Sequence, residues 1–521
     1  MKRTSGEHWR LAIFASVAFI TFAAFAAQAG ATRSNGPDSP GAGANKDHRT
    51  AAFVAALDAD GFTVDEGTVE LTDILYAVND HFIDSGAGAN AGQFYKRWVV
   101  PPAPGQTGTP EFLFRLAPDE AVVYVGKAPP QCDYFSFCAF LWSRSYPDSY
   151  LPTGDWLFAS VGDPLNNAWI KTEGQGNPSQ KNTIIVLTAD EGVYQQILKA
   201  AGSVGFPDSM VNPLVLPSNV LKLGQGTNSD SFFVLVRTAN IVSQAQEEKY
   251  LADNAWAKLY RVTPRVAPVL QPFAQPPWRE RAWKNEEELV PGLQAGLERL
   301  KQAILAQTAC VQARPLESSK AVPDSKDVLL DDPTSPAYRK NVMGESSDTP
   351  YRMSAENGEP ANFLLGNDDL VVVYGVNHAA TRISTYSSFA VYGDWYLNHL
   401  PLQPGDPRFM FGAGDPMWNG VAGITDHEYA GSAEQYIPHD PMARYLYAVR
   451  VVRKARAAAR DPYCVVVPEL GDSEAAPFYP DVIPLDKPAR IGYRAYLNPA
   501  TGAGPAYEDL IPDRAIWFKL Q

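Results

Sequence analysis

Cysteine and histidine are scarce in this chain, which has four cysteines and seven histidines among 521 residues. The cysteines are separated by 5, 171 and 153 residues, and these gaps match no zinc-binding spacing. The chain also lacks a G-x-S-x-G nucleophile elbow. It has neither a G-x-x-x-x-G-K phosphate loop nor a G-x-G-x-x-G fingerprint. These absences disfavour serine enzymes of the α/β-hydrolase type and nucleotide enzymes, and we predict no cofactor.

Positive charge is in deficit, because 44 lysines and arginines face 58 aspartates and glutamates, a net charge of −14. Non-specific binding to nucleic acid or to an anionic membrane surface is therefore disfavoured. The composition, 45% hydrophobic and 20% charged, excludes an intrinsically disordered chain. The partner we expect is an unidentified extracellular small molecule or polymer.

The N-terminus carries the only long apolar run. Lys2, Arg3 and Arg10 precede an uncharged stretch over residues 11–27, and Ala27-Gln28-Ala29 follows as an A-x-A cleavage signal. This order predicts a signal peptide at 1–29 and a secreted or periplasmic protein with no stable membrane insertion after cleavage. An uncleaved anchor is the alternative. Residues 30–48, rich in Gly, Ser and Asn, are expected to be a flexible leader.

Four cysteines in an exported chain predict two disulfides. Three pairings are possible. We favour Cys132 with Cys138, as a tight local loop, and Cys310 with Cys464, as a long-range tie.

Hydrophobic patterning predicts a mixture of strands and helices. Short β-branched runs indicate strands at 121–125, 157–161, 183–187 and 232–236. Helical spacing indicates helices at 191–201, 247–260 and 286–308. Residues 49–110 read as an N-terminal helical segment, and 311–360, rich in Ser, Asp and Pro, read as a linker or long loop.

Part of the pattern occurs twice. A constant offset of 252 aligns residues 134–167 with 386–419 without a gap, and the run ending at Gly126 resembles the run ending at Gly375. We therefore predict an α+β fold with two copies of a duplicated mixed α/β module, at 111–275 and 361–521, joined by a central helix at 276–310. Coincidence between two aromatic, turn-rich stretches is the alternative.

The repeated Gly-Asp-Pro motif offers the first candidate residues. Asp163 and Asp415 each follow an expected strand, and paired carboxylates can divide acid and base roles if the modules face one another. The structural alternative is that an Asp before Pro initiates a turn.

The second candidate lies where the copies differ. Lys127-Ala128-Pro129 corresponds to Val376-Asn377-His378, and a histidine at a strand end can act as acid, base or ligand. A packed histidine with both nitrogens satisfied is the alternative. A metal site from His378, His427 and Asp415 is a further option that we do not favour.

Aromatic residues concentrate in the repeated blocks, and aromatic faces stack on sugar rings. We expect Tyr134, Tyr386 and Trp418, with Asn377, to contact a ligand. Two functions therefore stay open. One is a secreted hydrolase with an Asp/His cleft between the modules, using Asp163 or Asp415 as base and His378 as partner. The other is a non-catalytic extracellular protein that binds a ligand or glycan.

Overall fold

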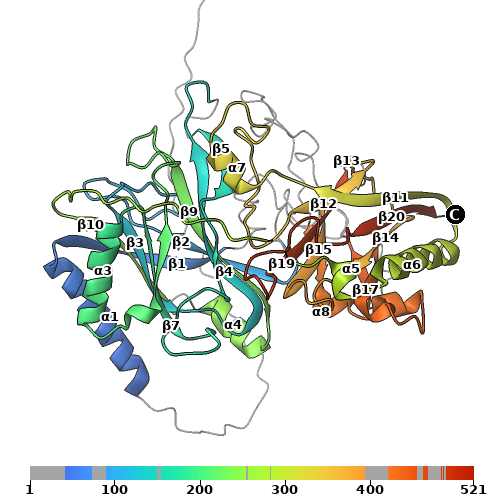
Figure 1. Cartoon of the computed structure of the whole chain (residues 1–521), viewed down its shortest axis with the longest axis horizontal. Coiled ribbons are helices and arrows are strands. Elements are labelled where there is room, and N and C mark those ends of the chain that lie inside the picture. The colour runs from blue at the N-terminus through green and yellow to red at the C-terminus, as the bar shows by residue number, and fades with distance from the viewer. Residues whose placement is uncertain are drawn as a thin grey trace, which may run out of the picture. The chain divides into compact units, whose positions relative to one another are not determined.

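The computed structural model describes residues 41–72, 90–149, 154–253, 256–281, 283–393, 421–453, 462–467, 483, 485 and 488–520 (Figure 1). Residues 48–521 form one compact unit. The expected signal peptide, Asp415 and Trp418 lie outside the described residues. No helix in the described ranges is both long enough and apolar enough to cross a membrane.

The first half of the chain forms a ten-stranded sheet with the order β5-β4-β9-β2-β1-β10-β3-β7-β8, and β6 pairs with β4. Its pairs are antiparallel except for β7 and β8, which run parallel. The strands are β1 (Phe62–Thr72), β2 (Gln93–Val99), β3 (Ala121–Lys127), β4 (Cys132–Arg144), β5 (Asp155–Ser160), β6 (Leu165–Asn166), β7 (Asn182–Thr188), β8 (Val211–Val215), β9 (Ser231–Ile241) and β10 (Ala257–Pro264).

The second half forms another ten-stranded sheet, with the order β16-β15-β19-β12-β11-β20-β14-β17-β18 and with β13 paired to β12. Here too, among the described strands, only the pair β17 and β18 is parallel. The strands are β11 (Cys310–Lys320), β12 (Arg352–Glu356), β13 (Glu359–Pro360), β14 (Asp369–Val376), β15 (Tyr386–Gly393), β16 (Val421–Thr425), β17 (Leu446–Val452), β18 (Cys464–Val466), β19 (Ala489–Tyr496) and β20 (Arg514–Leu520).

The two sheets correspond strand for strand. If β6 and β13 are set aside, each strand of one sheet has a counterpart at the same place in chain order and in sheet order. Corresponding positions also fill the two cores: Val122 and Val371, Phe137 and Phe389, and Val234 and Ile491 are all buried. The fold is therefore mixed α+β, mostly sheet, and its two similar sheets indicate a duplication.

Helices cover one face of each sheet (Figure 1). On the first sheet, α1 (Gly41–Ala59) and α3 (Glu191–Ser203) pack on β3 and β7. On the second, α6 (Leu293–Gln307) packs on β14, β17 and β20 through Leu293, Leu297, Leu300 and Ile304. The other helices in the described residues are short: α4 (Gln244–Ala252), α5 (Glu286–Leu289), α7 (Ser325–Leu329), α8 (Asp426–Tyr429), and the 3-10 turns Asp208–Met210, Ser432–Gln435 and Ala443–Tyr445.

Several segments differ from the expectation. Within 49–110, expected to be helical, α1 ends at Ala59, and β1 and β2 follow. The helix expected at 247–260 ends at Ala252, and residues 257–260 belong to β10. The expected linker 311–360 contains β11 and β12. In each case pairing with distant strands, which local spacing does not reveal, decides the structure.

The helix expected at 286–308 is present in two parts. α5 and α6 are separated by Val290, Pro291 and Gly292, and Gly292 has a φ of 96°. These parts lie between β10 and β11 in the chain, where a central helix was expected. The buried face of α6 packs on the second sheet alone, and α6 precedes β11 as α1 precedes β1.

The ungapped repeat holds only in its first part. Phe140 on β4 pairs with Ser160 on β5 in the first sheet, while the corresponding Tyr392 on β15 pairs with Val421 on β16 in the second. The offset is 252 at Phe140 and Tyr392 and 261 at their partners, so the second copy has nine extra residues in between. The sequence match of Asp163 to Asp415 assumes one constant offset, and the strand pairing of the two sheets does not support that assumption.

The predicted disulfides are wrong. Cys132 and Cys138 lie six residues apart on the continuous strand β4 and are free thiols. An extended strand separates such residues by about 20 Å, whereas a disulfide needs Cα atoms within about 7 Å. Burial raises the pKa of the Cys132 thiol to about 12. Cys310 on β11 and Cys464 on β18 have three strands between them in the second sheet, so this pair is not bridged either.

Candidate functional site

Tyrosines that correspond in the two sheets meet at the contact between them. The ring of Tyr496 on β19 lies 4.6 Å from that of Tyr134 and 5.6 Å from that of Tyr386. All three rings are fully buried. The structure therefore brings Tyr134 and Tyr386 together, as packing residues within the protein and not on a surface that a ligand could reach.

The contacts on the two sides of this cluster are reciprocal. The hydroxyl of Tyr386 donates to the carbonyl of Ala91, ahead of β2, and the hydroxyl of Tyr134 donates to Asp348, ahead of β12. Each half also has an equivalent hydrogen bond of its own at this place: the amide of Asn240 donates to Gly92 O at 3.1 Å within the first half, and that of Leu497 donates to Asp348 O at 2.9 Å within the second.

Asn240 and Leu497 end corresponding strands, and both have a left-handed backbone, with φ of 52° and 55°. Reciprocal contacts of this kind are those of a twofold interface between equivalent surfaces. We call this set of contacts the inter-sheet seam.

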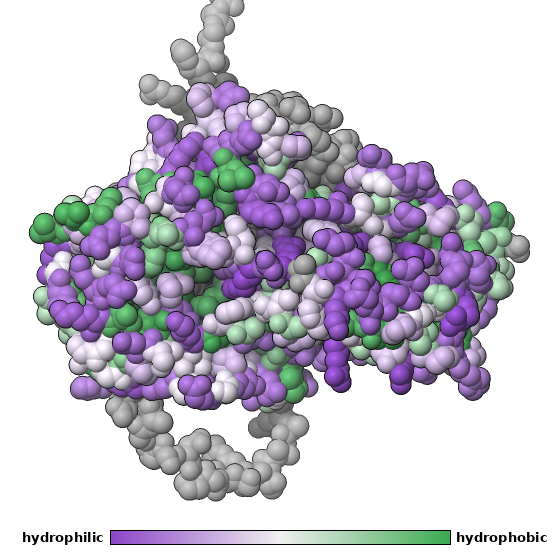
Figure 2. All heavy atoms as spheres, in the orientation of Figure 1, coloured by the Kyte–Doolittle hydropathy of each residue, from purple (hydrophilic) through white to green (hydrophobic). Residues whose placement is uncertain are grey.

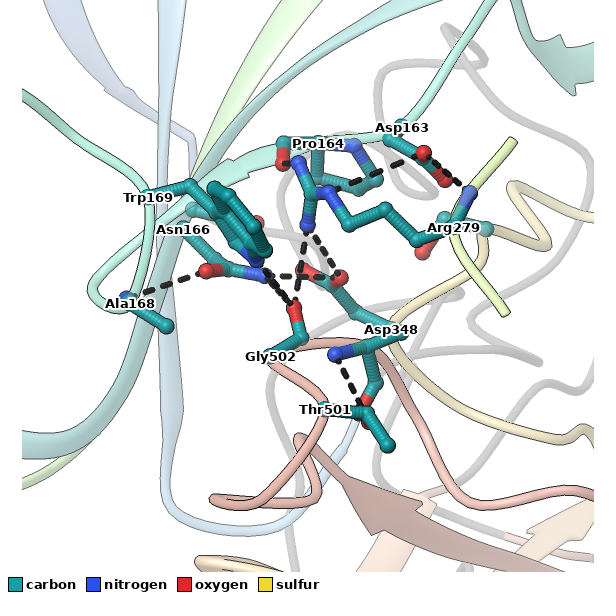
Figure 3. A network of polar contacts seen from close by, with 12 residues as sticks. Asp163, Pro164, Asn166, Ala168, Trp169, Arg279, Asp348, Thr501 and Gly502 are labelled. Atoms are coloured by element: carbon teal, nitrogen blue, oxygen red, sulfur yellow. Dashed lines mark hydrogen bonds and ion pairs between the residues drawn. The ribbon is translucent and has the colours of Figure 1, made fainter. Parts of the chain in front are cut away.

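Asp348 is the charged group at the seam (Figure 3). Its side chain is fully buried and accepts hydrogen bonds from the Tyr134 hydroxyl and from Asn166 Nδ2, each at 2.9 Å. A guanidinium nitrogen of Arg279 lies 3.8 Å away. Burial disfavours the charged carboxylate and raises the pKa of Asp348 to about 6.

Asp163 holds Arg279 in place beside this carboxylate (Figure 3). Its Oδ2 accepts a hydrogen bond from the Arg279 backbone amide at 2.7 Å and lies 3.6 Å from Arg279 Nε. The guanidinium also donates to the carbonyls of Pro164 and Gly502. Asp163 thus occupies a structural role in these contacts, while its expected partner Asp415 falls outside the described residues.

His378 lies in a different network. Its Nδ1 is 2.8 Å from Glu286 and its Nε2 is 3.2 Å from Asp513. Although desolvation acts in the opposite direction, the two carboxylates together raise the pKa of His378 to about 10. The imidazole is 2% exposed and its partners differ from those of Asp163, so the structure does not bring these two candidates together. Asn377, also buried, accepts from the amides of Ala379 and Ala380 and closes the turn after β14.

One group of side chains has the composition of a metal site. Asp133, Asp426 and His427 place ligand atoms within 4.8 Å of one another. Asp133 Oδ2 lies 2.7 Å from His427 Nε2 and accepts from Asn240, and Asp426 Oδ1 accepts from the Ser387 amide. The three groups therefore already satisfy one another and their neighbours. His427 is placed with these aspartates and not with His378.

A pocket of about 570 Å³ opens beside the seam. This volume lies within the range of small-molecule sites. The residues around it come from three segments that are distant in the chain: Trp278, Arg279, Glu280 and Arg281; Asp324, Lys326, Glu345 and Ser347; and Ala506, Tyr507 and Glu508.

An ion pair fixes one wall of the pocket. Arg281 donates to Glu345 at 2.7 Å and to the Ser346 carbonyl, while Glu345 also accepts from the Ser325 amide. The Tyr507 ring is oriented by its hydroxyl, which accepts a hydrogen bond from the Tyr351 amide. The walls are thus held in position by contacts within the protein.

Ser347 is the one pocket residue whose hydroxyl is unused. It is 4% exposed, and within the described part of the chain its Oγ has no hydrogen-bond partner. A buried hydroxyl without a partner costs about 1–3 kcal/mol.

Sequence reasoning missed this pocket because its residues look like linker. Residues 278–281 lie in the expected connector helix, and 324–347 lie in the expected loop. Residues 345–349 are all polar, Glu-Ser-Ser-Asp-Thr, and all buried. A polar run normally indicates an exposed loop, so the sequence itself carried no signal of burial.

Hydrophilic side chains cover most of the face shown in Figure 2, and hydrophobic residues form scattered patches on it.

Comparisons with known proteins extend this description only slightly. A scan against protein-family models gives no match, and a search of the curated proteins gives none. Among solved structures, the chain is similar to the VPA0106 protein from Vibrio parahaemolyticus, with a TM-score of 0.35, 11% identity, and coverage of 91% of this chain and 99% of that one. It is also similar to an uncharacterized protein from Burkholderia cenocepacia, with a TM-score of 0.34, 11% identity, and coverage of 93% and 91%. Similarity of this degree carries no argument about function.

Proposed function

We propose that this protein is a secreted or periplasmic binding protein for a small, hydroxyl-rich molecule such as a saccharide, held in the pocket beside the seam. The observation that carries the proposal is a pocket lined by Trp278 and Tyr507 together with Ser347, whose buried hydroxyl has no partner among the described residues. Sugars combine hydroxyl groups with an apolar ring face, and the pocket supplies both hydrogen-bonding groups and aromatic surface.

The geometry favours binding over hydrolysis. The candidate acid and base residues His378 and Asp163 are each held by charged neighbours, and neither lines the pocket. Glu345, the most buried carboxylate of the pocket, is neutralised by Arg281. These contacts thus favour the second function predicted from the sequence, a non-catalytic protein that binds a ligand or glycan. The secreted or periplasmic location rests on the N-terminal sequence pattern alone.

Calorimetric titration of the protein with a panel of neutral mono- and oligosaccharides tests the proposal. We expect binding that Ser347→Ala weakens two- to tenfold, because one hydrogen bond is lost. Trp278→Ala should weaken it further through the loss of ring stacking. Absence of binding to the whole panel at millimolar concentrations would overturn the proposal.

Two matched controls separate ligand contact from general destabilisation. Ser318→Ala removes another buried hydroxyl without a partner among the described residues, on β11 and away from the pocket. Trp283→Ala removes an indole that is 43% exposed and outside the pocket lining. Both controls should leave the affinity unchanged; if they weaken binding as much as Ser347→Ala and Trp278→Ala do, the pocket is not the site.

A further inference from the structure

The charges around the pocket are not all neutralised within the protein. Three cations and four carboxylates line it. Arg281 pairs with Glu345 at 2.7 Å, and Asp324 pairs with Lys320 at 2.8 Å. Arg279 is held by Asp163 and faces Asp348. These pairs account for both arginines and for two of the four carboxylates.

Three charged groups remain, and all are exposed at the pocket. In the described ranges, Glu280, Glu508 and Lys326 form no hydrogen bond and no ion pair. Arg352, buried next to Tyr507, exerts a long-range attraction on Glu508, but it also faces Asp513 and Glu286 and shares its charge among them. The balance of the free groups is one positive against two negative charges.

Other features of the pocket also favour a positively charged ligand. The face of Trp278 carries the negative potential of an aromatic ring, which attracts cations. The Tyr507 ring already has two cations of the protein over it, Lys320 at 4.8 Å and Arg352 at 5.7 Å from its centroid. The protein as a whole has a net charge of −14, which favours the approach of a positive ligand. The hydroxyl of Ser347 accepts a hydrogen bond as readily as it donates one, so it suits either an amine or a hydroxyl of the ligand.

We infer that the ligand is an amino sugar: a hydroxyl-rich ring whose protonated amine lies between the carboxylates of Glu280 and Glu508 and the Trp278 ring. This inference rests on the proposed function, because it assigns the charge of a molecule that the pocket would already recognise by its hydroxyl groups. Lys326 would oppose the amine and so sets a limit to the affinity.

Titration with three probes that share one ring tests the charge: glucosamine, glucose and glucuronate, at a pH where the amine is protonated and the carboxyl is ionised. We expect glucosamine to bind three- to tenfold more tightly than glucose, and glucuronate to bind most weakly. Because exposed charges are screened by salt, 0.5 M NaCl should bring the affinities of glucosamine and glucose close together.

Charge variants assign the effect to residues. The double variant Glu280→Gln with Glu508→Gln should lower the affinity for glucosamine to that for glucose, and Lys326→Gln should raise it. Glu359→Gln, an exposed carboxylate on β13 and away from the pocket, is the matched control and should have no effect. An unchanged preference for glucosamine in the double variant would overturn the assignment to these carboxylates.

The two proposals fail in different ways. Equal binding of glucosamine and glucose, or tighter binding of glucuronate, overturns the amino-sugar inference and leaves saccharide binding intact. No binding of any of the three probes, together with none of the neutral panel, overturns the proposed function and this inference with it.

Discussion

The two sheets share a strand order but differ at one end. In the second sheet, the end of β14 leads to His378, which lies between Glu286 and Asp513, and the Tyr447 hydroxyl donates to Asp513 at 2.7 Å. In the first sheet, the register places Pro129, Ala257 and Thr183 where His378, Asp513 and Tyr447 stand. A buried ionic network in one half thus corresponds to small or apolar residues in the other.

Both halves nevertheless have a glycine near the end of the corresponding strand, Gly126 on β3 and Gly375 on β14. A Cβ on Gly126 would lie 2.5 Å from the Cβ of Ala257, and a Cβ on Gly375 would lie 2.6 Å from Asp513 Oδ1. At Gly126 the clash is with Ala257 of the neighbouring strand, whereas at Gly375 it is with the Asp513 and Tyr447 side chains of the ionic network itself. The comparison shows that the two halves need glycine at this place because of different neighbours, and that in the second half the glycine makes room for the ionic network.

The largest expected effect comes from removing the histidine of this network. His378→Ala would leave Glu286 and Asp513 buried without their cation, and we expect the free energy of unfolding to fall by about 3–5 kcal/mol. Pro129→Ala, at the corresponding place in the first sheet, should cost less than about 1 kcal/mol. Urea unfolding of both variants measures the contrast, and equal losses would show that the two ends are equivalent.

The contribution of this network to the free energy of unfolding decreases as the pH rises. Because the pKa of His378 is raised from its usual 6.5 to about 10, its contribution to stability is complete below pH 6.5 and is lost as the pH rises to 10. Unfolding measured between pH 6 and 10 should show this loss in the wild type and not in His378→Ala. A parallel decline in both proteins would place the titration elsewhere.

A smaller effect is expected at the seam, where Asp348 has no carboxylate counterpart, since Gly92 stands at the corresponding place in the first half. The pKa of Asp348 is raised to about 6, so the group destabilises the fold progressively as the pH rises from about 4 to 6. This rise in the pKa of Asp348 corresponds to at most about 3 kcal/mol. Asp348→Asn should remove that decline in urea unfolding across this range; a decline that persisted would contradict the assignment.

The smallest expected difference concerns the two tyrosine hydroxyls of the seam. Tyr134 donates to the buried Asp348 and Tyr386 to the carbonyl of Ala91. Hydrogen bonds to charged groups contribute about 1.5–3 kcal/mol and neutral ones about 0.5–1.5. Tyr134→Phe should therefore lower the unfolding free energy by about 1 kcal/mol more than Tyr386→Phe above pH 6. Below pH 4, where Asp348 is neutral, the two variants should converge.

The sequence predicted those parts of the fold that local pattern determines. The strand at 183–187, the helix at 191–201 and the match of Tyr134 to Tyr386 all follow from short-range spacing. The strands β1, β2, β11 and β12 were missed because their pairing partners lie far away in the chain. The predicted repeat included residues beyond the part that matches, because an ungapped alignment cannot show the insertion in the second copy.

The candidate site was harder to predict than the fold. His378 stands out in the sequence as a difference between copies, yet its chemistry is set by Glu286 and Asp513, which are 92 and 135 residues away. Ser347 gave no signal, because the sequence does not show that a run of five polar residues is buried. Burial of polar groups depends on which segments meet, and that is decided only by the assembled sheets.

The seam also has a consequence for how the chain folds during synthesis. All ten strands of the first sheet come from residues 62–264, and its last strand, β10, pairs with its first, β1. This sheet is therefore complete before the ribosome has made β11. Until the second sheet forms, Tyr134 lacks Tyr496 and Asp348 as partners and stays open to solvent. A nascent chain halted after β10 would also lack Val328, Leu329 and Val342, which come from the segment after β11 and are buried in the core of the first sheet. The first sheet can therefore pair its strands early, but its core is completed only when residues from the second half of the chain are added.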